Sequence, residues 1–259
     1  MLTNAQTTVG IIPARYASTR FPGKSLALIG GKVMIQRVYE QAIRAKSLSE
    51  VVIAADDERI AQAAEAFGAR VIMTSKSCQS GTDRCAEAAQ RFPQATHFVN
   101  IQGDEPFILP EQIDLLTGAL TRIEAPLAIA TLCKRITDLR QALNPNVVKV
   151  TRNMRGEALY FSRSPIPHWR EAPNATQVES GLYFKHIGLY GYSSLALAHI
   201  ASLAPSPLEQ AESLEQLRWL ENGLCIAVAE TPWETLGVDT PDDLKAAELW
   251  LRDWGGTGA

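Results

Sequence analysis

The stretch Pro13-Ala-Arg-Tyr-Ala-Ser-Thr-Arg-Phe-Pro-Gly-Lys24 follows directly after the apolar run Val9-Gly-Ile-Ile12, and this junction decides the fold. The run is typical of a buried strand, and ligands of open α/β sheets bind in the loops that leave the carboxyl ends of such strands. Arginine pairs with phosphate oxygens through two hydrogen bonds, and lysine acts as a point charge. The loop therefore predicts a polyphosphate site more strongly than a solvated basic turn. Its cations and hydroxyls are Arg15, Arg20, Lys24, Ser18 and Thr19.

The tripeptide Gly23-Lys24-Ser25 is similar to part of a Walker A loop, which binds phosphates in P-loop ATPases. That motif requires a glycine five residues before its Gly-Lys pair, and this chain has Ser18 there. Pro22 also interrupts the loop. A P-loop ATPase is therefore not expected.

The first half of the chain alternates short apolar runs with amphipathic stretches. Such alternation predicts a parallel sheet with helices on both faces. The expected strands are 9–12, 51–55, 69–73 and 97–101, and the expected helices are 32–46, 58–68 and 83–90.

The middle of the chain changes character, because strand-like segments follow one another closely. They indicate a smaller inserted sheet region within a mixed, mostly parallel α/β fold. The segments are 127–134, 146–151, 157–161 and 185–192. One helix is expected over 207–221, with a capping box between Ser206 and Glu209. A last strand over 224–230 and a helix from Pro241 to about Trp254 complete the fold.

Composition excludes several classes of protein. The 259 residues carry a net charge of −3 and a pI near 5.9, so no broad cationic field is available for nucleic acid. The segment Met1–Thr8 lacks the features of a signal peptide, and no apolar run is long enough for membrane insertion. The four cysteines show no metal-type spacing and are typical of reduced thiols, so a cytoplasmic location is expected.

Two aspartates are candidate magnesium ligands. Asp104 lies in Gln102-Gly-Asp-Glu-Pro106, after an expected strand, and Asp239 lies in Gly237-Val-Asp-Thr-Pro241, before an expected helix. Magnesium prefers one or two carboxylates, with phosphate oxygens and water completing its shell. Each aspartate also has a structural interpretation, as a turn residue or as a partner of the helix dipole.

Eight blocks then occur in order: VGIIPARYASTRFPGKSL, QSGTDR, NIQGDEP, NPNVVKV, ALYFSRSPIP, KHIGLYGY, SPLEQAESLEQLRWLENG and GVDTPDDL. Together they resemble the 3-deoxy-manno-octulosonate cytidylyltransferase family, from about Val9 to Leu251. One departure is Ser25, where the family pattern has proline. The resemblance implies a Rossmann-like nucleotidyltransferase fold, usually as a homodimer, that joins the sugar acid Kdo to CMP from CTP for lipopolysaccharide synthesis.

The resemblance also implies roles for individual residues. It places Arg15 and Lys24 on the triphosphate and Asp104 and Asp239 on Mg²⁺, and these four residues are the candidate catalytic groups. The nucleotide would be bound by Ala14, Arg15, Lys24, Gln79, Ser80, Gly81 and Arg84. The sugar acid would be bound by Gln102, Arg163, His186, Tyr190, Glu212 and Glu215.

We expect one domain over 1–259. In it, about 9–126 and 224–254 form the nucleotide and metal part, and about 127–223 form the sugar-binding and dimerisation part. Two alternatives stay open: a related transferase for an 8-amino Kdo analogue or a sialic acid, and a non-catalytic nucleotide-sugar-binding protein. The residues also leave open the number of magnesium ions, any general base and the degree of UTP use.

Overall fold

The structure is a computed structural model that describes residues 6–17, 21–170 and 178–254. The chain divides into two compact units. Unit 1 is Met1–Asp114 with Thr235–Ala259, and unit 2 is Leu115–Glu234. The division falls within about twelve residues of each expected boundary, and the functions expected of the two parts stay predictions.

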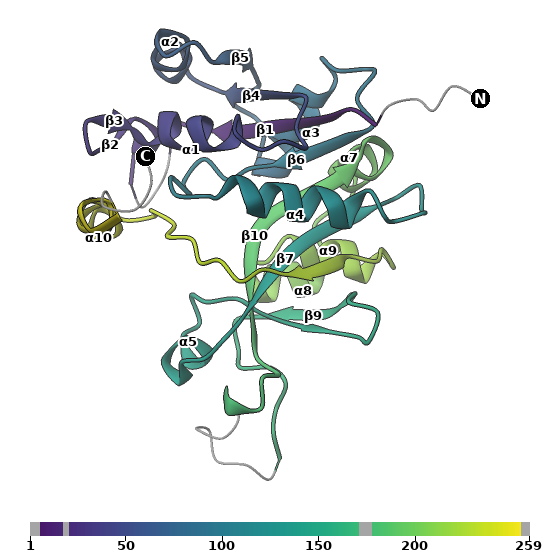
Figure 1. The fold of residues 1–259 in the computed structure, drawn as a ribbon. Helices are drawn as coiled ribbons and strands as arrows, with labels where there is room; N and C mark the ends of the chain where they lie inside the picture. Colours follow the sequence, from purple (N-terminus) through teal and green to yellow (C-terminus); the bar gives the residue numbers. More distant parts are fainter. Residues whose placement is uncertain (1–5, 18–20, 171–177, 255–259) are drawn as a thin grey trace. The chain divides into compact units, whose positions relative to one another are not determined.

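Unit 1 contains the parallel sheet expected from the first half of the chain. Strand β1 lies between β4 and β6, and β4 also pairs with β5, all in parallel (Figure 1). The strands are β1 (Thr8–Ala14), β4 (Glu50–Ala55), β5 (Arg70–Met73) and β6 (His97–Asn100). The helices that connect them are α1 (Met34–Ala42), α2 (Glu58–Ala66) and α3 (Gly81–Ala89). Strand–helix alternation therefore predicted this sheet correctly.

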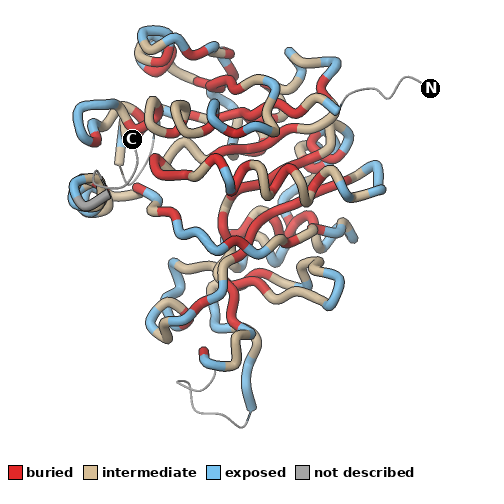
Figure 2. Tube along the Cα trace, in the orientation of Figure 1, coloured by how far each residue is buried: buried red, intermediate tan, exposed pale blue. Residues whose placement is uncertain are grey.

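The interior of this sheet is apolar because β1 and β4 are buried on both faces, as a parallel sheet requires. Ile11, Ile12 and Ile53 have no exposed surface, and Figure 2 shows the buried course of these strands in red. Strand β1 continues beyond its expected end, because Pro13 and Ala14 stay in register with Ala54 and Ala55.

A second cluster of unit 1 brings the C-terminal segment against the N-terminal half. Phe107 packs on Trp250 of α10 (Pro241–Trp254), with ring centroids 4.2 Å apart. Ile29, Met34, Val238 and Ala247 are fully buried in the same cluster. Ile29 belongs to a hairpin that the sequence did not predict, β2 (Leu28–Ile29) with β3 (Lys32–Val33), so α1 begins at Met34 and not at Lys32. This packing carries Asp239 toward Asp104.

In unit 2, the strands expected in the middle of the chain form mostly antiparallel pairs. Strand β7 (Ile129–Arg135) pairs antiparallel with β10 (Phe184–Ser193) and parallel with β11 (Ala227–Glu230). Strands β8 (Lys149–Arg152) and β9 (Ala158–Ser162) pair antiparallel, and β8 meets β10 where Lys149 is opposite Lys185. The register of β10 shifts between Ile187 and Tyr190, a bulge that changes the direction of the side chains there.

The single helix expected over 207–221 is wrong. The structure has two short helices, α8 (Pro207–Glu212) and α9 (Gln216–Glu221), because Ser213 adopts a left-handed conformation with φ 51° and ψ 51°. The break lets Leu217 and Trp219 turn into the core, where both are buried. The predicted pair between Glu209 and the Ser206 N–H is present at 3.1 Å.

Helices that the sequence did not predict are α4 (Pro110–Leu120), α5 (Leu139–Leu143) and α7 (Ser194–Ala201). Within the described ranges, no helix is both long enough and apolar enough to cross a bilayer.

Candidate active site

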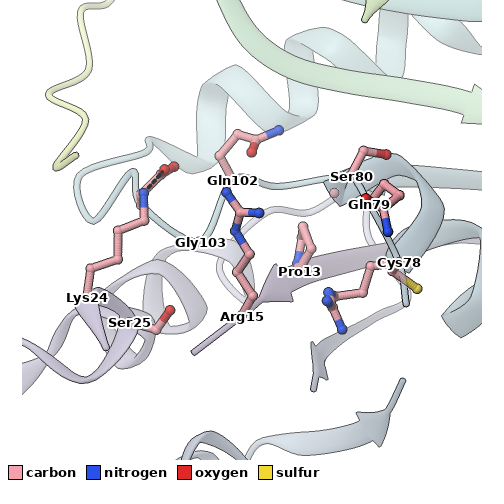
Figure 3. A pocket seen from close by; sticks show the side chains of 12 residues that line it. Pro13, Arg15, Lys24, Ser25, Cys78, Gln79, Ser80, Gln102 and Gly103 are labelled. Atoms are coloured by element: carbon pink, nitrogen blue, oxygen red, sulfur yellow. Dashed lines mark hydrogen bonds and ion pairs between the residues drawn. The ribbon is translucent and has the colours of Figure 1, made fainter. Parts of the chain in front are cut away.

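A polar cavity of about 170 Å³ opens at the carboxyl ends of the parallel strands of unit 1 (Figure 3). It lies where the sequence predicted a phosphate site. It is lined by Pro13, Arg15, Lys24, Ser25, Cys78, Gln79, Ser80, Gly81, Arg84, Gln102, Gly103 and Asp104. Ala14 is 2% exposed and does not line the cavity, and Ser18, Thr19 and Arg20 lie outside the described residues.

Arg15 provides a positive charge in this cavity. Its side chain is exposed, and Figure 3 shows the guanidinium extending into the space between Gln102 and Ser80. Its guanidinium forms no hydrogen bond or ion pair with the described part of the chain. A guanidinium in such a position can bind a phosphate group without first breaking another contact.

The N-terminus of α3 forms the opposite wall. Ser80 caps the helix by accepting a hydrogen bond from the Asp83 N–H at 3.1 Å. The Asp83 carboxylate in turn accepts from the backbone N–H groups of Gln79 and Ser80, both at 3.0 Å. The Gln79 side-chain amide donates to Ser77 O at 2.8 Å, so it is held against its own loop. Base recognition by Gln79 stays a prediction.

Asp56 supports the site through its contact with the cavity-lining Arg84, and the sequence analysis did not predict this role. One carboxylate oxygen accepts from the Tyr16 N–H at 3.0 Å, and the other pairs with Arg84 at 3.0 Å. Arg84 is 3% exposed, so its charge is committed to this pair while its side chain still lines the cavity. Asp56 thereby connects the loop after β1, through Tyr16, with helix α3, through Arg84. The sequence does indicate a role for Asp56, because this aspartate directly follows the buried strand that ends at Ala55.

Lys24, Asp104 and Asp239 form one ion-paired cluster. The Lys24 ammonium lies 2.6 Å from Asp104 Oδ2 and 2.8 Å from Asp239 Oδ1. Burial by itself lowers the pKa of Lys24, but the two carboxylates outweigh it and raise that pKa above its usual value. The structure therefore brings together two aspartates that are 135 positions apart in the sequence.

The donor set fits a magnesium ion. Asp104 and Asp239 provide carboxylate oxygens, their side chains are 29% and 44% exposed, and both bind the same positive charge. Among the described residues no group of three or more His, Cys, Asp or Glu side chains forms a complete metal site. A magnesium ion held by two aspartates needs phosphate oxygens or water as its other ligands, which is its usual arrangement at phosphate sites.

Gly103 sets the position of the loop that carries Asp104. A Cβ atom at this position would lie 2.8 Å from Pro13 O, closer than real contacts allow. Only glycine lets the loop approach the end of β1 this closely.

In unit 2, the predicted carboxylate-binding Arg163 contacts backbone oxygens. Its guanidinium donates to Glu212 O at 2.7 Å, Pro145 O at 3.1 Å and Ser213 O at 3.3 Å. It thus fastens the joint between α8 and α9 to the loop before β8. Its role in binding a carboxylate stays a prediction.

Glu212 lies beside this arginine. Its carboxylate accepts from Ser162 Oγ at 2.6 Å and from the Arg163 N–H at 2.9 Å. Glu215 lies 3.9 Å from the Arg218 guanidinium, in the segment between the two helices. The helix expected over 207–221 would have carried both glutamates, but the break at Ser213 separates them into two segments.

His186 and Tyr190 lie in an aromatic cluster on β10. Their ring centroids are 5.3 Å apart, and Tyr190 packs against Trp219 at 5.1 Å. Burial lowers the pKa of His186 to about 3, and its Nε2 lies 3.0 Å from the Thr131 hydroxyl. Burial raises the pKa of Tyr190 well above its usual value, and Glu215 raises it further. Both groups are therefore neutral at pH 7.

Comparison with known proteins shows the class to which the chain belongs. The family model described as Cytidylyltransferase matches residues 9–230. The parallel sheet, the cation-lined cavity and this match define an enzyme of the nucleotidyltransferase class.

Two relatives and one solved structure identify the family more closely. The 3-deoxy-manno-octulosonate cytidylyltransferase of Geobacter metallireducens is 53% identical over 248 residues, which cover 93% of this chain and 97% of that protein. The protein of the same name from Cytophaga hutchinsonii is 52% identical, covering 91% and 94%. A structure of CMP:2-keto-3-deoxy-manno-octonic acid synthetase complexed with CTP matches with a TM-score of 0.88 at 43% identity, covering 96% and 99%. The chain belongs to the 3-deoxy-manno-octulosonate cytidylyltransferase family, and the expected family and fold class are confirmed.

Proposed function

We propose that this chain transfers CMP from CTP to the sugar acid Kdo, with release of pyrophosphate, for lipopolysaccharide biosynthesis. One observation carries the proposal. The polar cavity of unit 1 presents Arg15, Lys24 and Asp104 together, in a chain that is about half identical to relatives named for this reaction.

The cavity suits a triphosphate that reacts at its α-phosphorus. The anomeric hydroxyl of the sugar acid would attack this phosphorus, and pyrophosphate would leave. Arg15 would bind phosphate oxygens, and Lys24 would neutralise the charge that develops on the leaving group. Catalysis of this kind depends on positioning and on preorganised charge. We assign no protein general base.

We further propose that Asp104 and Asp239 hold Mg²⁺. The ion would supply charge neutralisation on phosphate oxygens and lower the pKa of a coordinated hydroxyl. One carboxylate oxygen of each aspartate already contacts the same positive charge, the Lys24 ammonium, and this arrangement supports the assignment.

Unit 2 carries the groups proposed to recognise the sugar. Glu212, Glu215 and the aromatic cluster offer oxygen acceptors beside apolar rings, which suits a molecule with many hydroxyls. The indole N–H of Trp219, beside Tyr190 in this cluster, is buried and has no hydrogen-bond partner among the described residues.

The test is a pyrophosphate-release assay with the purified full chain. CTP, UTP, ATP and GTP are each combined with Kdo, its 8-amino analogue and a sialic acid. We expect CTP with Kdo to give the highest kcat/KM and the purines to give little turnover, because a site that hydrogen-bonds one base rejects others by leaving its own polar groups unpaired. Preference for another acid would support a related transferase. Binding without turnover would support a non-catalytic protein.

We also propose a cytoplasmic homodimer. The four cysteines remain thiols, two of them buried, as is usual in a reducing compartment. Leu159 and Leu195 of unit 2 are each 61% exposed, and such apolar side chains are available to a second copy. Light scattering should give twice the chain mass of 28.3 kDa. A mass equal to that of one chain would contradict the dimer.

A further inference from the structure

The ammonium of Lys24 occupies the space between the two aspartates proposed to bind magnesium. Its contacts of 2.6 Å and 2.8 Å use one oxygen of Asp104 and one of Asp239. The lysine side chain is 13% exposed, less than either carboxylate. Figure 3 shows the Lys24 side chain at one end of the cavity, where a dashed line marks its ion pair with a side chain of the cavity lining. Within the cluster, one positive charge neutralises half of the carboxylate charge.

The backbone at Lys24 is held by hydrogen bonds, so a change of partner by its ammonium would involve the side chain alone. Gly23 has a φ of 70° and its N–H donates to Tyr16 O at 2.9 Å, and Ala27 N–H donates to Lys24 O at 3.0 Å. A lysine side chain has four rotatable bonds, and its ammonium exchanges one anionic partner for another readily. The triphosphate proposed for the same cavity is such a partner, and it carries more negative charge than the two aspartates.

Arg15 differs from Lys24, because it lines the same cavity without an ion pair to a carboxylate among the described residues. Because its guanidinium has no hydrogen-bond or ion-pair partner among the described residues, the incoming triphosphate can bind there first. The phosphates then compete with Asp104 and Asp239 for the Lys24 ammonium. Once the ammonium moves to the phosphates, both carboxylates are released to a divalent cation.

We propose that Lys24 is an internal counterion that keeps the aspartate pair from binding a divalent cation until a nucleotide triphosphate arrives. The metal then enters with or after the nucleotide, and the nucleotide-free enzyme binds it weakly. This inference rests on the proposed function, because it assumes that the cavity accepts a triphosphate.

The test measures Mn²⁺ binding to the nucleotide-free full chain, by the electron paramagnetic resonance signal of unbound Mn²⁺. Wild type should bind weakly, and Lys24→Met should bind Mn²⁺ at least tenfold more tightly. Lys24→Arg should stay weak, because it retains the positive charge. The double variant Lys24→Met with Asp104→Asn should lose the gain. Lys245→Met is the matched control, because Lys245 pairs with Asp242 at 2.8 Å on the exposed surface, and it should bind like wild type.

Equal Mn²⁺ affinity in wild type and Lys24→Met would overturn the proposal, as would tight binding by the nucleotide-free wild type. Circular dichroism at the assay temperature verifies that each variant is folded. If Lys24→Met is unfolded, Lys24→Gln is measured in its place, since it is also uncharged but remains polar. Because no arm contains nucleotide or sugar, the result is separate from the turnover assay. If the chain shows no turnover with CTP and Kdo but gives the expected pattern of Mn²⁺ affinities, the proposed function is refuted and the role of Lys24 is not.

Discussion

Asp104 and Asp239 are the residues on which the metal assignment depends. Asp104→Asn and Asp239→Asn keep side-chain size but remove the negative charge at each position. We expect each to lower kcat by about 10²–10³ or more, because one preorganised electrostatic contact is typically worth that much. The circular dichroism spectrum should not change. Near-wild-type kcat for both variants at saturating Mg²⁺ would show that neither aspartate holds the ion.

Asp56 provides a test of how the walls of the cavity are held together. Asp56→Asn keeps an oxygen acceptor for the Tyr16 N–H but removes the charge that pairs with the buried Arg84. We expect a higher KM for CTP, with a smaller change in kcat, and a loss of stability on the order of 3 kcal/mol, as for other broken buried pairs. Asp57→Asn is the control, because its partner Arg59 is 58% exposed and such pairs contribute little. An unchanged KM for CTP would leave Asp56 a structural residue only.

Arg163 has two interpretations that one substitution separates. Arg163→Lys keeps the charge but loses the planar group that reaches three backbone carbonyls. If the guanidinium also binds the sugar carboxylate, the KM for the sugar acid should rise much more than the KM for CTP. Arg170→Lys, at an exposed position, is the control. A lower unfolding temperature with an unchanged sugar KM would show that Arg163 only fastens the joint between α8 and α9.

At the scale of elements, the approach of the Asp104 loop to β1 depends on one missing side chain. Gly103→Ala places a methyl group about 2.8 Å from Pro13 O, so the loop must move away from the strand. We expect a loss of about 1–3 kcal/mol in stability, as for other overpacked sites, together with a lower kcat/KM for CTP. Thermal unfolding and steady-state kinetics measure the two effects.

Gly118→Ala is the matched control for this variant. Gly118 lies inside α4, where the nearest atom to a new Cβ is the end of the Arg122 side chain at 4.0 Å. Alanine there should be neutral or stabilising by about 0.5–1 kcal/mol. If Gly103→Ala behaved like Gly118→Ala, the close approach would not matter for the site.

At the scale of the whole molecule, buried His186 makes stability depend on pH. A histidine titrates near pH 6.5 in an unfolded chain, whereas burial lowers the pKa of His186 to about 3 in the folded one. Between these values the unfolded state binds more protons, so the stability of the fold falls as the pH decreases from about 6.5 to about 3.

His186→Gln should reduce this dependence, because glutamine can still bond to Thr131 but does not titrate. We expect a smaller drop in melting temperature between pH 7 and pH 4 for this variant than for wild type. His199→Gln, at an exposed position, should behave like wild type. Equal drops for His186→Gln and wild type would mean that other groups cause the loss of stability in acid.

The sequence by itself determined the parallel strands of unit 1 and the helices that connect them, and it predicted a phosphate site at the carboxyl ends of these strands. Local apolar runs such as Val51–Ala55 specify buried strands because their pattern needs no distant information. The loop from Pro13 to Lys24 was predicted to bind phosphate because the carboxyl ends of parallel strands meet at one edge of a sheet. The ordered blocks identified the family.

Tertiary structure alone decided which distant residues meet and which local patterns are overridden. The contact of Lys24 with both aspartates depends on the packing of Phe107 against Trp250, which no local pattern encodes. The break at Ser213 depends on the burial of Leu217 and Trp219 and on the carbonyls that Arg163 holds, so a periodic sequence was divided into two helices. Local periodicity records the preferences of one segment, whereas burial and long-range hydrogen bonds act between segments and can outweigh those preferences.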